Sequence, residues 1–299
     1  MTTTYVFTDF GSAEHEQFFE GPTPEPGPGQ LLIDVRAAGV NPYDWKLRSG
    51  LFGRKAKLPR AMGVEAAGVV RAVGPDVEGF PVGTEVVGTV AKGFGGYADQ
   101  TVLRAAATVE KPAALSFTDA AVMPVAGVTA YDGTHQIELE RGQTLVILGA
   151  GGGVGTIATQ IGGVHKFNVI GVAGESKQDY LRGLGATPVV YGPGLADRLR
   201  AASSGTIDLV LDLVGGDSLR AALEVVSADR IITTVDSGAV AEHGVLELQH
   251  DPEALKKIVD VASYGLIDPQ VTVVPLAEAG RAVAEVEGGH STGNIVLVP

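Results

Sequence analysis

The chain has 299 residues, a formal net charge of −13 and no cysteine. With 45% hydrophobic and 19% charged residues, it is long and apolar enough for two folded domains and unlike a disordered protein. The absence of cysteine excludes disulfides, thiol nucleophiles and cysteine-ligated metals. The acidic balance argues against nucleic acid or an anionic membrane as a partner, because both attract basic surfaces.

The first third of the chain has the pattern of a β-rich domain. Short apolar runs are separated by glycine and proline, which is typical of a small barrel or sandwich. Met1–Phe10 has no basic segment before an apolar one, and the weakly polar stretch Ala120–Ala130 is short and broken by Pro124 and Gly127. We therefore expect no signal peptide, no membrane span and a cytoplasmic location. The expected strands are Tyr5–Phe7, Gln17–Glu20, Gln30–Val40, Gly63–Val73, Thr84–Val90 and Tyr97–Leu103.

The sequence pattern changes after Pro112, from short strands to helices. Ser116 is placed to cap a short helix over Phe117–Val122, with Asp119 as the capping-box acid. A second helix is expected to begin near Pro124 and to carry Val125 to Ile137.

The stretch Thr144–Gly155, TLVILGAGGGVG, predicts a strand, a glycine turn and a helix. Leu145 to Leu148 are apolar without alternation, as in a parallel strand covered on both faces. Glycines permit a tight turn, a close approach of the backbone to a pyrophosphate, and close packing of helix on strand. The N-terminus of the helix adds free N–H groups for the phosphates. This favours a dinucleotide site over a flexible loop, on Gly151, Gly152, Gly153, Val154 and Gly155.

Strands and helices alternate after Thr144, which predicts a doubly wound parallel sheet of Rossmann type. Further strands are expected over Val169–Ala173, Pro188–Val190, Ile207–Leu213 and Arg230–Val235, and helices over Ser176–Gly183, Leu195–Ala202, Ser218–Val226 and Pro252–Tyr264. The tail, with a strand at Val271–Val274, a helix at Leu276–Val286 and a strand at Gly293–Val298, is assigned to the first domain. The sequence thus predicts an α/β chain with a β-rich domain at 1–115, completed by 272–299, and a Rossmann dinucleotide-binding domain at 116–271.

Six motifs follow one another in a fixed order along the chain. They are AGVNPYD at 38–44, GVEAAG at 63–68, GGYA at 95–98, GVTAY at 127–131, the glycine turn, and GNIVL at 293–297. In this order they resemble the medium-chain dehydrogenase/reductase superfamily, and most of all its zinc-free quinone oxidoreductases related to zeta-crystallin. The resemblance covers essentially the whole chain. It implies a GroES-like β domain and a Rossmann domain with the active site in the cleft between them, and a homodimer, as is common among the relatives.

The residues argue against a metal site. Zinc-binding members of this superfamily carry a catalytic cysteine where this chain has Asn41, and a histidine where it has Val64. Neither residue offers the thiolate or imidazole that zinc favours. The six histidines show no metal-ligand spacing, so we expect no metal.

The end of the second strand of the Rossmann sheet bears on the choice between NADPH and NADH. Gly174 is expected at the tip of the strand, and Glu175 near the position whose carboxylate accepts from the ribose hydroxyls of NADH. Ser176 and Lys177 can instead hold a 2′-phosphate through a hydroxyl and a point charge. The resemblance implies such a lysine here, and a tyrosine, matched by Tyr191, near the adenosine phosphate. We expect NADP(H) as the preferred cofactor, with NAD(H) as the alternative.

Without a metal, polar side chains have to stabilise the oxyanion that develops on the acceptor carbonyl. The resemblance places Asn41 and Tyr43 at the active site, facing the nicotinamide, where an amide N–H or a phenol O–H can donate to that oxygen. Tyr43 is also a candidate proton donor, and solvent is the alternative. Both residues have structural alternatives, since Asn41 can be part of a simple turn and Tyr43 a half-buried aromatic. The same resemblance assigns Asp44 as a structural acceptor.

Three further segments are candidates for contacts with the nicotinamide half of the cofactor. Thr129 matches a threonine that the family places on that side, although an ordinary helix residue is the alternative. The fourth and fifth strands of the sheet end at the edge where ligands bind in open α/β folds. Backbone groups there are expected to hold the carboxamide, at Val214, Val235 and Ser237.

The sequence as a whole predicts a zinc-independent oxidoreductase that transfers hydride from NADPH to a quinone or a conjugated enone. An alkenal or enoyl reductase with the same mechanism is one alternative. A non-catalytic NADPH-binding redox sensor is the other. Substrate preference is expected to depend on the loops at 50–59 and 239–251, whose composition does not identify the acceptor.

Overall fold

The structure, a computed structural model, describes all residues of the chain except 56, 204, 236 and 290. The chain divides into two compact units. Unit 1 comprises Met1–Val125, Leu255–Tyr264 and Gln270–Pro299, and unit 2 comprises Ala126–Ala254 and Gly265–Pro269. The domain boundaries expected from the sequence stay a prediction.

Unit 1 is organised around the long strand β3 (Gln30–Val40). One edge of β3 pairs with β5 (Glu65–Val73), which pairs with β6 (Glu85–Val90), and β6 pairs with β7 (Gln100–Glu110). The first half of β3 then pairs with β7, so these four strands close on themselves and leave few free edges. The second half pairs with β15 (Asn294–Val298).

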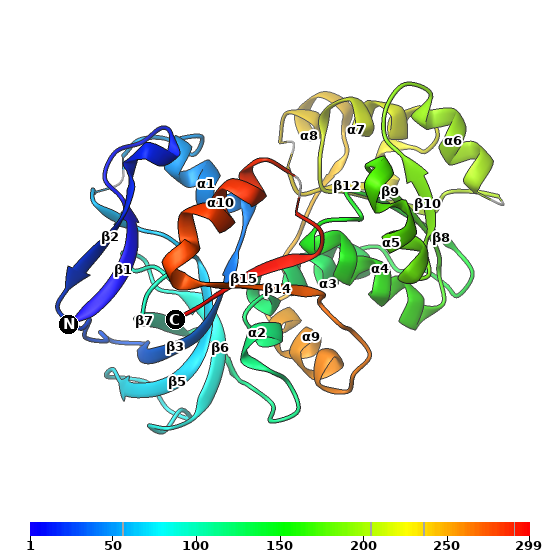
Figure 1. The fold of residues 1–299 in the computed structure, drawn as a ribbon. Coiled ribbons are helices and arrows are strands. Elements are labelled where there is room, and N and C mark those ends of the chain that lie inside the picture. The colour runs from blue at the N-terminus through cyan, green and yellow to red at the C-terminus, as the bar shows by residue number, and fades with distance from the viewer. Residues whose placement is uncertain (56, 204, 236, 290) are drawn as a thin grey trace. The chain divides into compact units, whose positions relative to one another are not determined.

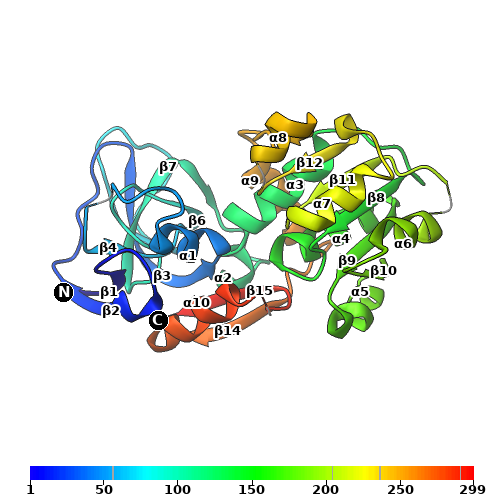
Figure 2. The ribbon, with the colours of Figure 1, turned by 90° about the horizontal axis from the view of Figure 1, so that it is seen from above.

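The remaining strands of unit 1 lie around this closed sheet. β1 (Thr2–Phe7) pairs with β2 (Glu16–Gly21) and β4 (Arg60–Ala61). β14 (Val271–Pro275) runs parallel to β15, and the connection between them contains α10 (Ala279–Glu287). Figure 2 shows α10 lying along these two strands. The buried core includes Phe7, Leu31, Ile33, Val70 and Leu103.

The helix α1 (Pro42–Ser49) follows β3 directly and was not expected from the sequence. Asn41 is its N-cap residue and Pro42 occupies its first turn, which are favoured residues at those positions. Gly50 ends the helix with a φ of +88°, a conformation that favours glycine. The simple turn considered as an alternative at Asn41-Pro42 is therefore the start of a helix. Tyr43 and Asp44 lie in the first turn of this helix.

Unit 2 contains a six-stranded parallel sheet in the order β10-β9-β8-β11-β12-β13. This is the strand order of a Rossmann fold. The chain adds strands first to one side of β8 and then, from β11 on, to the other side, and ligands bind in such folds at the point between these two strands. The predicted α/β class, with a β-rich part and a doubly wound parallel sheet, is confirmed. The strands are β8 (Thr144–Leu148), β9 (Asn168–Ala173), β10 (Thr187–Val190), β11 (Leu209–Asp212), β12 (Ile231–Thr233) and β13 (Leu246–Glu247).

Helices cover both faces of this sheet, and neighbouring residues of a strand pack on opposite layers. Leu145 reaches α4, where Gly162 leaves room for it, whereas Val146 packs in one cluster with Leu199 of α6. Figure 1 shows α6 and α7 above the strands and α4 below them. The helices are α3 (Val128–His135), α4 (Gly153–His165), α5 (Gln178–Gly183), α6 (Leu195–Ala202), α7 (Gly216–Leu223) and α8 (Ser237–His243).

The segment before α3 differs in part from the prediction. The short helix α2 (Phe117–Ala120) is capped by Ser116, whose Oγ accepts the Asp119 N–H at 3.0 Å, as predicted. The helix expected from Pro124 instead begins as a π-turn at Met123–Gly127 and continues as α3. Three further elements follow: α9 (Ala254–Ser263) in the region expected to be a helix, and α8 and β13, which were not expected and which overlap the predicted loop at 239–251. Short 3₁₀ turns lie at Ala13–His15, Glu175–Lys177, Ala228–Arg230 and Leu276–Glu278.

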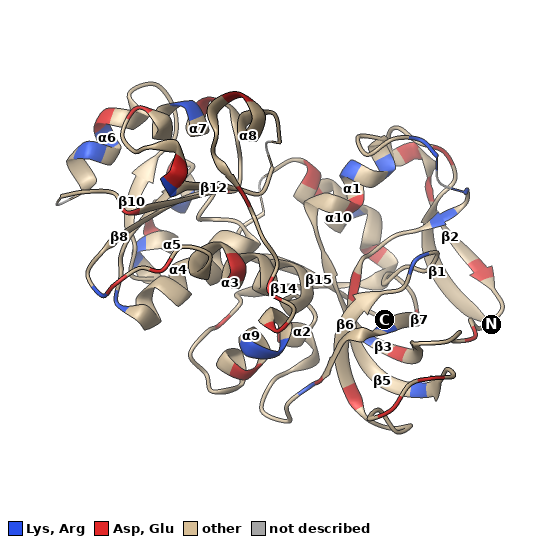
Figure 3. Ribbon diagram, turned by 180° about the vertical axis from the view of Figure 1, so that it is seen from behind, with Lys and Arg blue, Asp and Glu red and all other residues tan. Residues whose placement is uncertain are grey.

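Charged residues are distributed over the elements of both units. Figure 3 shows lysine and arginine scattered among the more numerous acidic residues rather than gathered on one element. In the part of the chain that the structure describes, every helix is too short or too polar to cross a membrane.

Candidate active site

The glycine turn of unit 2 lies where the strand order reverses, between the carboxyl ends of β8 and β11. Gly149 has a φ of +96°, and a Cβ there would lie 3.1 Å from Val214 Cγ1. A Cβ on Gly155 would lie 2.4 Å from the Gly149 carbonyl oxygen, so the first turn of α4 rests directly on the turn. Both positions therefore require glycine, one for its conformation and both for close packing.

The start of α4 offers the groups that a pyrophosphate needs. Gly152 is the N-cap residue in an extended conformation, and α4 begins at Gly153. The N–H groups of this first turn have no intrahelical acceptor and lie at the positive end of the helix dipole. The nearest atom to a Cβ on Gly152 would be 3.7 Å away, and none would lie within 4 Å of one on Gly174. Backbone amides with open space beside them fit a dinucleotide.

Lys177 lies across this turn. Its Nζ is 3.5 Å from the Gly151 carbonyl oxygen, and its Cδ is 2.5 Å from where a Gly151 Cβ would be. The side chain is half-buried, and burial lowers the pKa of Lys177. Ser176 and Glu175 are exposed beside it. The structure thus holds a partly desolvated cation against the backbone expected to bind phosphate.

Tyr191 and the end of β11 complete the surroundings of the turn. The Tyr191 hydroxyl lies 3.8 Å from the position of a Gly149 Cβ, and burial raises the pKa of Tyr191 to about 12. The fully buried Asp212 shapes the segment after β11: its Oδ1 accepts the N–H groups of Val214 (3.1 Å) and Gly215 (2.8 Å). Asp212 therefore fixes the backbone at Val214, which was a predicted contact.

The remaining predicted contacts in unit 2 lie on other elements. Val235 and Ser237 follow β12 at the same edge of the parallel sheet as Val214, and Asp236 between them lies outside the described residues. Thr129 lies in the first turn of α3. The structure thus gathers Gly151 to Gly155, Gly174, Lys177, Tyr191 and Val214 around one turn, and the roles of Thr129, Val235 and Ser237 stay predictions.

In unit 1, Asn41 is held through its backbone and its side chain. Its N–H donates to Asp44 Oδ2 at 2.8 Å, in the capping box that begins α1. Its Nδ2 donates to Glu65 Oε1 at 2.6 Å. Tyr97 donates its hydroxyl to the same Asp44 oxygen at 2.6 Å. These bonds fix the amide and use one of its two N–H donors on Glu65.

Two carboxyl groups are buried in this network. Glu65 is fully buried, and its Oε2 accepts the Val125 N–H at 2.8 Å. Burial raises the pKa of Glu65 to about 8 and that of Asp44 to about 6, although the hydrogen bonds that each accepts act in the opposite direction. Buried acids with raised pKa values beside a candidate catalytic residue are a common feature of active sites.

Tyr43 is exposed, in contrast to Asn41. Its side chain is 42% exposed, and its ring stacks on that of Phe52 with centroids 5.0 Å apart. Its position in the first turn of α1 places it two residues from Asn41. The pair Asn41 and Tyr43 thus combines a fixed amide with an accessible phenol.

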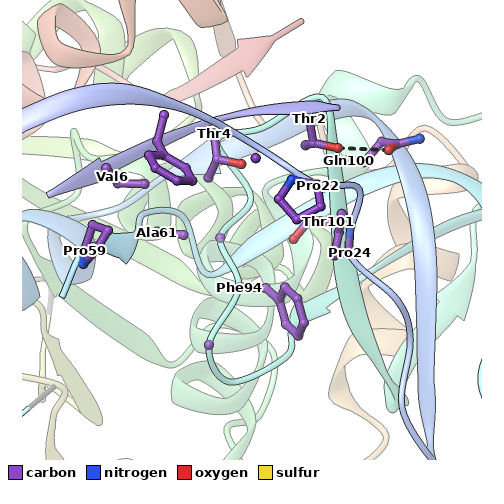
Figure 4. Close-up of a pocket in the computed structure, with 14 residues that line it drawn as sticks. Thr2, Thr4, Val6, Pro22, Pro24, Pro59, Ala61, Phe94, Gln100 and Thr101 are labelled. Atoms are coloured by element: carbon purple, nitrogen blue, oxygen red, sulfur yellow. Dashed lines mark hydrogen bonds between the residues drawn. The ribbon is translucent and has the colours of Figure 1, made fainter. Parts of the chain in front are cut away.

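A separate pocket of about 220 Å³ opens elsewhere in unit 1. Figure 4 shows it between Thr4, Pro22, Phe94 and Thr101, with a hydrogen bond from Thr2 to Gln100 along its rim. It contains none of the residues predicted to bind cofactor or substrate. We assign no step of the reaction to it.

Comparison with known families matches both parts of the chain. The alcohol dehydrogenase GroES-like domain matches residues 27–113, and the zinc-binding dehydrogenase family matches residues 184–297. A quinone oxidoreductase from Pseudomonas aeruginosa is 30% identical to this chain over 100% of both proteins. The chain belongs to the medium-chain dehydrogenase/reductase superfamily, in its quinone oxidoreductase branch.

Other members of the superfamily resemble the chain equally well. The mouse synaptic vesicle membrane protein VAT-1 homolog is 31% identical over 98% of this chain and 71% of its own length. An NADPH-dependent alkenal/one oxidoreductase of Arabidopsis thaliana chloroplasts is 29% identical over 99% of this chain and 79% of its own. The named relatives include several oxidoreductases, and this member of the superfamily is an oxidoreductase enzyme.

Solved structures of the superfamily agree with the fold. The quinone oxidoreductase of Coxiella burnetii has a TM-score of 0.90 at 29% identity, over 100% of this chain and 99% of its own. The Escherichia coli quinone oxidoreductase complexed with NADPH has a TM-score of 0.87 at 25% identity, over 99% of this chain and all of its own.

The zinc in the name of one matched family raises the question of a metal site in this superfamily member. Asn41 and Val64 offer no thiolate or imidazole. Among the residues that the structure describes, no three His, Asp or Glu side chains come together in a way that could hold a metal ion. A metal-free mechanism stays a prediction from the chemistry of these residues.

Two residues important to this arrangement, Glu65 and Asp212, lie in segments that the sequence singled out, but no role was predicted for their side chains. Each is an acid within or at the end of an otherwise apolar strand, GVEAAGVV and LVLD. A buried carboxyl needs hydrogen-bond partners, so a lone acid in such a strand is the signal that could have identified both.

Proposed function

We propose that this oxidoreductase transfers hydride from NADPH to a small quinone or conjugated enone without a metal. The observation that carries the choice of NADPH is the half-buried Lys177, whose side chain crosses Gly151 at the glycine turn. Only the phosphorylated dinucleotide has a 2′-phosphate for this cation to pair with. The names of the Arabidopsis relative and the E. coli structure, which include NADPH, support the proposal.

The residues of unit 2 divide the work of holding the cofactor. The backbone of Gly151 to Gly155 would hold the pyrophosphate at the start of α4. Gly174, Ser176, Lys177 and Tyr191 would hold the adenosine end, and the backbone at Val214, Val235 and Ser237, with Thr129, the nicotinamide end. When bound, the nicotinamide supplies the hydride.

The residues of unit 1 act on the acceptor. Asn41 donates the second N–H of its fixed amide to the carbonyl oxygen, where negative charge develops. Tyr43, whose phenol is accessible, is the candidate donor of the proton that completes the reduction, with water as the alternative. A removal of one such oxyanion donor typically lowers kcat by about 10²–10³-fold.

The test is spectrophotometric. Loss of NADPH and of NADH absorbance is followed separately with a quinone, an enone, an alkenal and a saturated aldehyde as acceptors. We expect oxidation of NADPH in preference to NADH with the first two acceptors. Preferential oxidation of NADH would contradict the choice of cofactor, and turnover with the saturated aldehyde alone would contradict the acceptor class.

A second candidate function is reduction of alkenals by the same mechanism, favoured by the name of the Arabidopsis relative. Higher kcat/KM for the alkenal than for the quinone would select it. Binding of NADPH without turnover on any acceptor would instead select a redox sensor. A cytoplasmic location and a homodimer stay predictions from the sequence.

A further inference from the structure

Glu65 is the most deeply enclosed acid near the proposed acceptor site. It lies at the start of β5 and is fully buried. A Cβ on Gly39 of β3 would lie 2.0 Å from Glu65 Oε1, so no larger residue could stand beside it. Burial of a carboxyl group costs free energy unless its oxygens accept hydrogen bonds, so the partners of Glu65 decide whether it can be accommodated here.

Both oxygens of Glu65 face N–H donors. Oε1 lies 2.6 Å from Asn41 Nδ2, and Oε2 lies 2.8 Å from the Val125 backbone nitrogen. An ionised carboxylate only accepts, and so satisfies both donors. A protonated carboxyl would turn an O–H toward one of them. The geometry is therefore that of the ionised form.

We propose that Glu65 is the positioning residue of the acceptor site, whose carboxylate fixes the Asn41 amide so that its second N–H is presented to the acceptor carbonyl. This inference rests on the proposed function of Asn41. Asp44 holds the backbone of Asn41, and Glu65 holds its side chain, so the two acids have separate tasks. Glu65 itself touches neither substrate nor cofactor in this scheme.

The surroundings of Glu65 make this positioning dependent on pH. The titratable groups that act on it from neighbouring elements are Asp44 of α1, whose negative charge opposes ionisation, and Tyr97, which is bonded to Asp44. Burial, which is the largest cause, and the charge of Asp44 raise the pKa of Glu65 to about 8, although the hydrogen bonds from Asn41 and Val125 act in the opposite direction. The ionised form thus becomes dominant, and the Asn41 amide fully held, above that pH.

The contact can be observed directly by NMR, without turnover. Asn41, Asn168 and Asn294 are the three asparagines of the chain, so selective ¹⁵N-asparagine labelling gives three side-chain NH₂ signals. The Asn41 signal is the one lost in Asn41→Ser, which keeps a capping hydroxyl. We expect it to shift with a midpoint near pH 8 in the wild-type protein and to show no such transition in Glu65→Gln. The Asn168 signal is the internal control, because Asn168 donates to the Gly142 carbonyl.

Kinetics then test whether the contact serves the reaction. Glu65→Gln offers one acceptor where two are needed, and we expect kcat with NADPH to fall at least about tenfold, with KM for NADPH unchanged. The rise of wild-type kcat between pH 7 and pH 9 should vanish in this variant. Glu110→Gln, the same change at an exposed position of β7, should keep the wild-type profile.

The outcomes separate the two proposals. An Asn41 signal that does not titrate, or a Glu65→Gln variant with wild-type kcat and pH profile, would overturn the role of Glu65. A wild-type protein that oxidises neither NADPH nor NADH would instead overturn the proposed function, whatever the NMR titration shows.

Discussion

Lys177 is a charged side chain that this fold removes in part from water. Burial lowers the pKa of its half-buried amine, so a bound phosphate would both pair with Lys177 and act against that lowering, because a nearby negative charge favours the charged amine. The neighbouring Glu175 and Ser176 are exposed and carry no comparable constraint. In the proposed function, the preference for NADPH therefore depends on one cation.

Lys177→Ala should raise KM for NADPH by about 10- to 150-fold, since a charge-assisted hydrogen bond contributes about 1.5–3 kcal/mol. KM for NADH should change little, because NADH has no phosphate at this position. Steady-state kinetics with both nucleotides measure the difference. Lys166→Asn is the matched control, because Lys166 lies at the opposite end of α4 in a conformation that asparagine tolerates. An equal effect of Lys177→Ala on both nucleotides would remove the phosphate role.

Stability favours the protonated form of Glu65, whereas its proposed role in positioning Asn41 needs the ionised form. Its pKa is about 8 in the folded chain and ordinarily 4.5, so between these values folded Glu65 keeps a proton that the unfolded chain has released. The free energy of unfolding should therefore fall as pH rises through this window, by up to about 1.4 kcal/mol per pH unit. Asp44, with a pKa of about 6, adds to the slope only below that pH.

Urea unfolding from pH 6 to pH 8 tests this expectation. The single tryptophan, Trp45, lies in α1, so its fluorescence reports on unit 1. In Glu65→Gln the decline of the unfolding free energy over this range should be smaller than in the wild type. Equal slopes in the two proteins would contradict a raised pKa at Glu65.

At the scale of elements, two glycines of α4 differ in whether their surroundings leave room for a side chain. A Cβ at Gly155 would lie 2.4–2.5 Å from backbone atoms of Gly149 and Ala150. A Cβ at Gly163 would have no such neighbouring atom within 4 Å. Backbone cannot rotate away as a side chain can. The first position joins the helix to the glycine turn, and the second is a position where glycine only weakens the helix.

We predict that Gly155→Ala weakens binding of NADPH at least about tenfold, because the start of α4 has to move away from the turn. Gly163→Ala should leave binding unchanged and stabilise the protein by about 0.5–1 kcal/mol. Fluorescence titration of NADPH and thermal unfolding measure both effects. Normal binding by Gly155→Ala would show that the close approach of helix to turn is dispensable.

The elements that the sequence predicted best are those with strong patterns. Strand β3 and helix α6 have the predicted bounds, and the glycine turn lies between β8 and α4 as expected. The helix α1 was missed because its short, polar first turn has no apolar periodicity and its signals are a cap and a proline. The network of Asn41 and Glu65 joins residues 24 positions apart, and only the pairing of strands brings them together.

At the scale of the whole molecule, a buried ion pair joins distant parts of unit 1. Arg48 of α1 is 1% exposed and lies 2.7 Å from Glu16 of β2, and it also pairs with Glu287 of α10. Tyr5 donates to the second oxygen of Glu16 at 2.9 Å. Because removal of one partner leaves a buried charge without compensation, such a pair is costly to break.

Arg48→Met should lower the free energy of unfolding of unit 1 by about 3–5 kcal/mol. Arg281→Met is the matched control: it removes an arginine that is 57% exposed and pairs with Glu278, and it should cost at most about 1 kcal/mol. Urea unfolding followed by Trp45 fluorescence measures both. Similar losses in the two variants would show that burial of the Arg48 pair has no special weight.

The pairing of β3 with β15 has a consequence for biosynthesis. Residues 126–269 leave the ribosome between the two main segments of unit 1, which takes about 7–30 s at a translation rate of about 5–20 residues per second. Throughout that interval the nascent β3 lacks its pairing partner β15 along Ala38 to Val40, and Arg48 lacks Glu287. The nascent chain thus offers an open strand edge to chaperones, or to other nascent chains on the same messenger, until β15 is made.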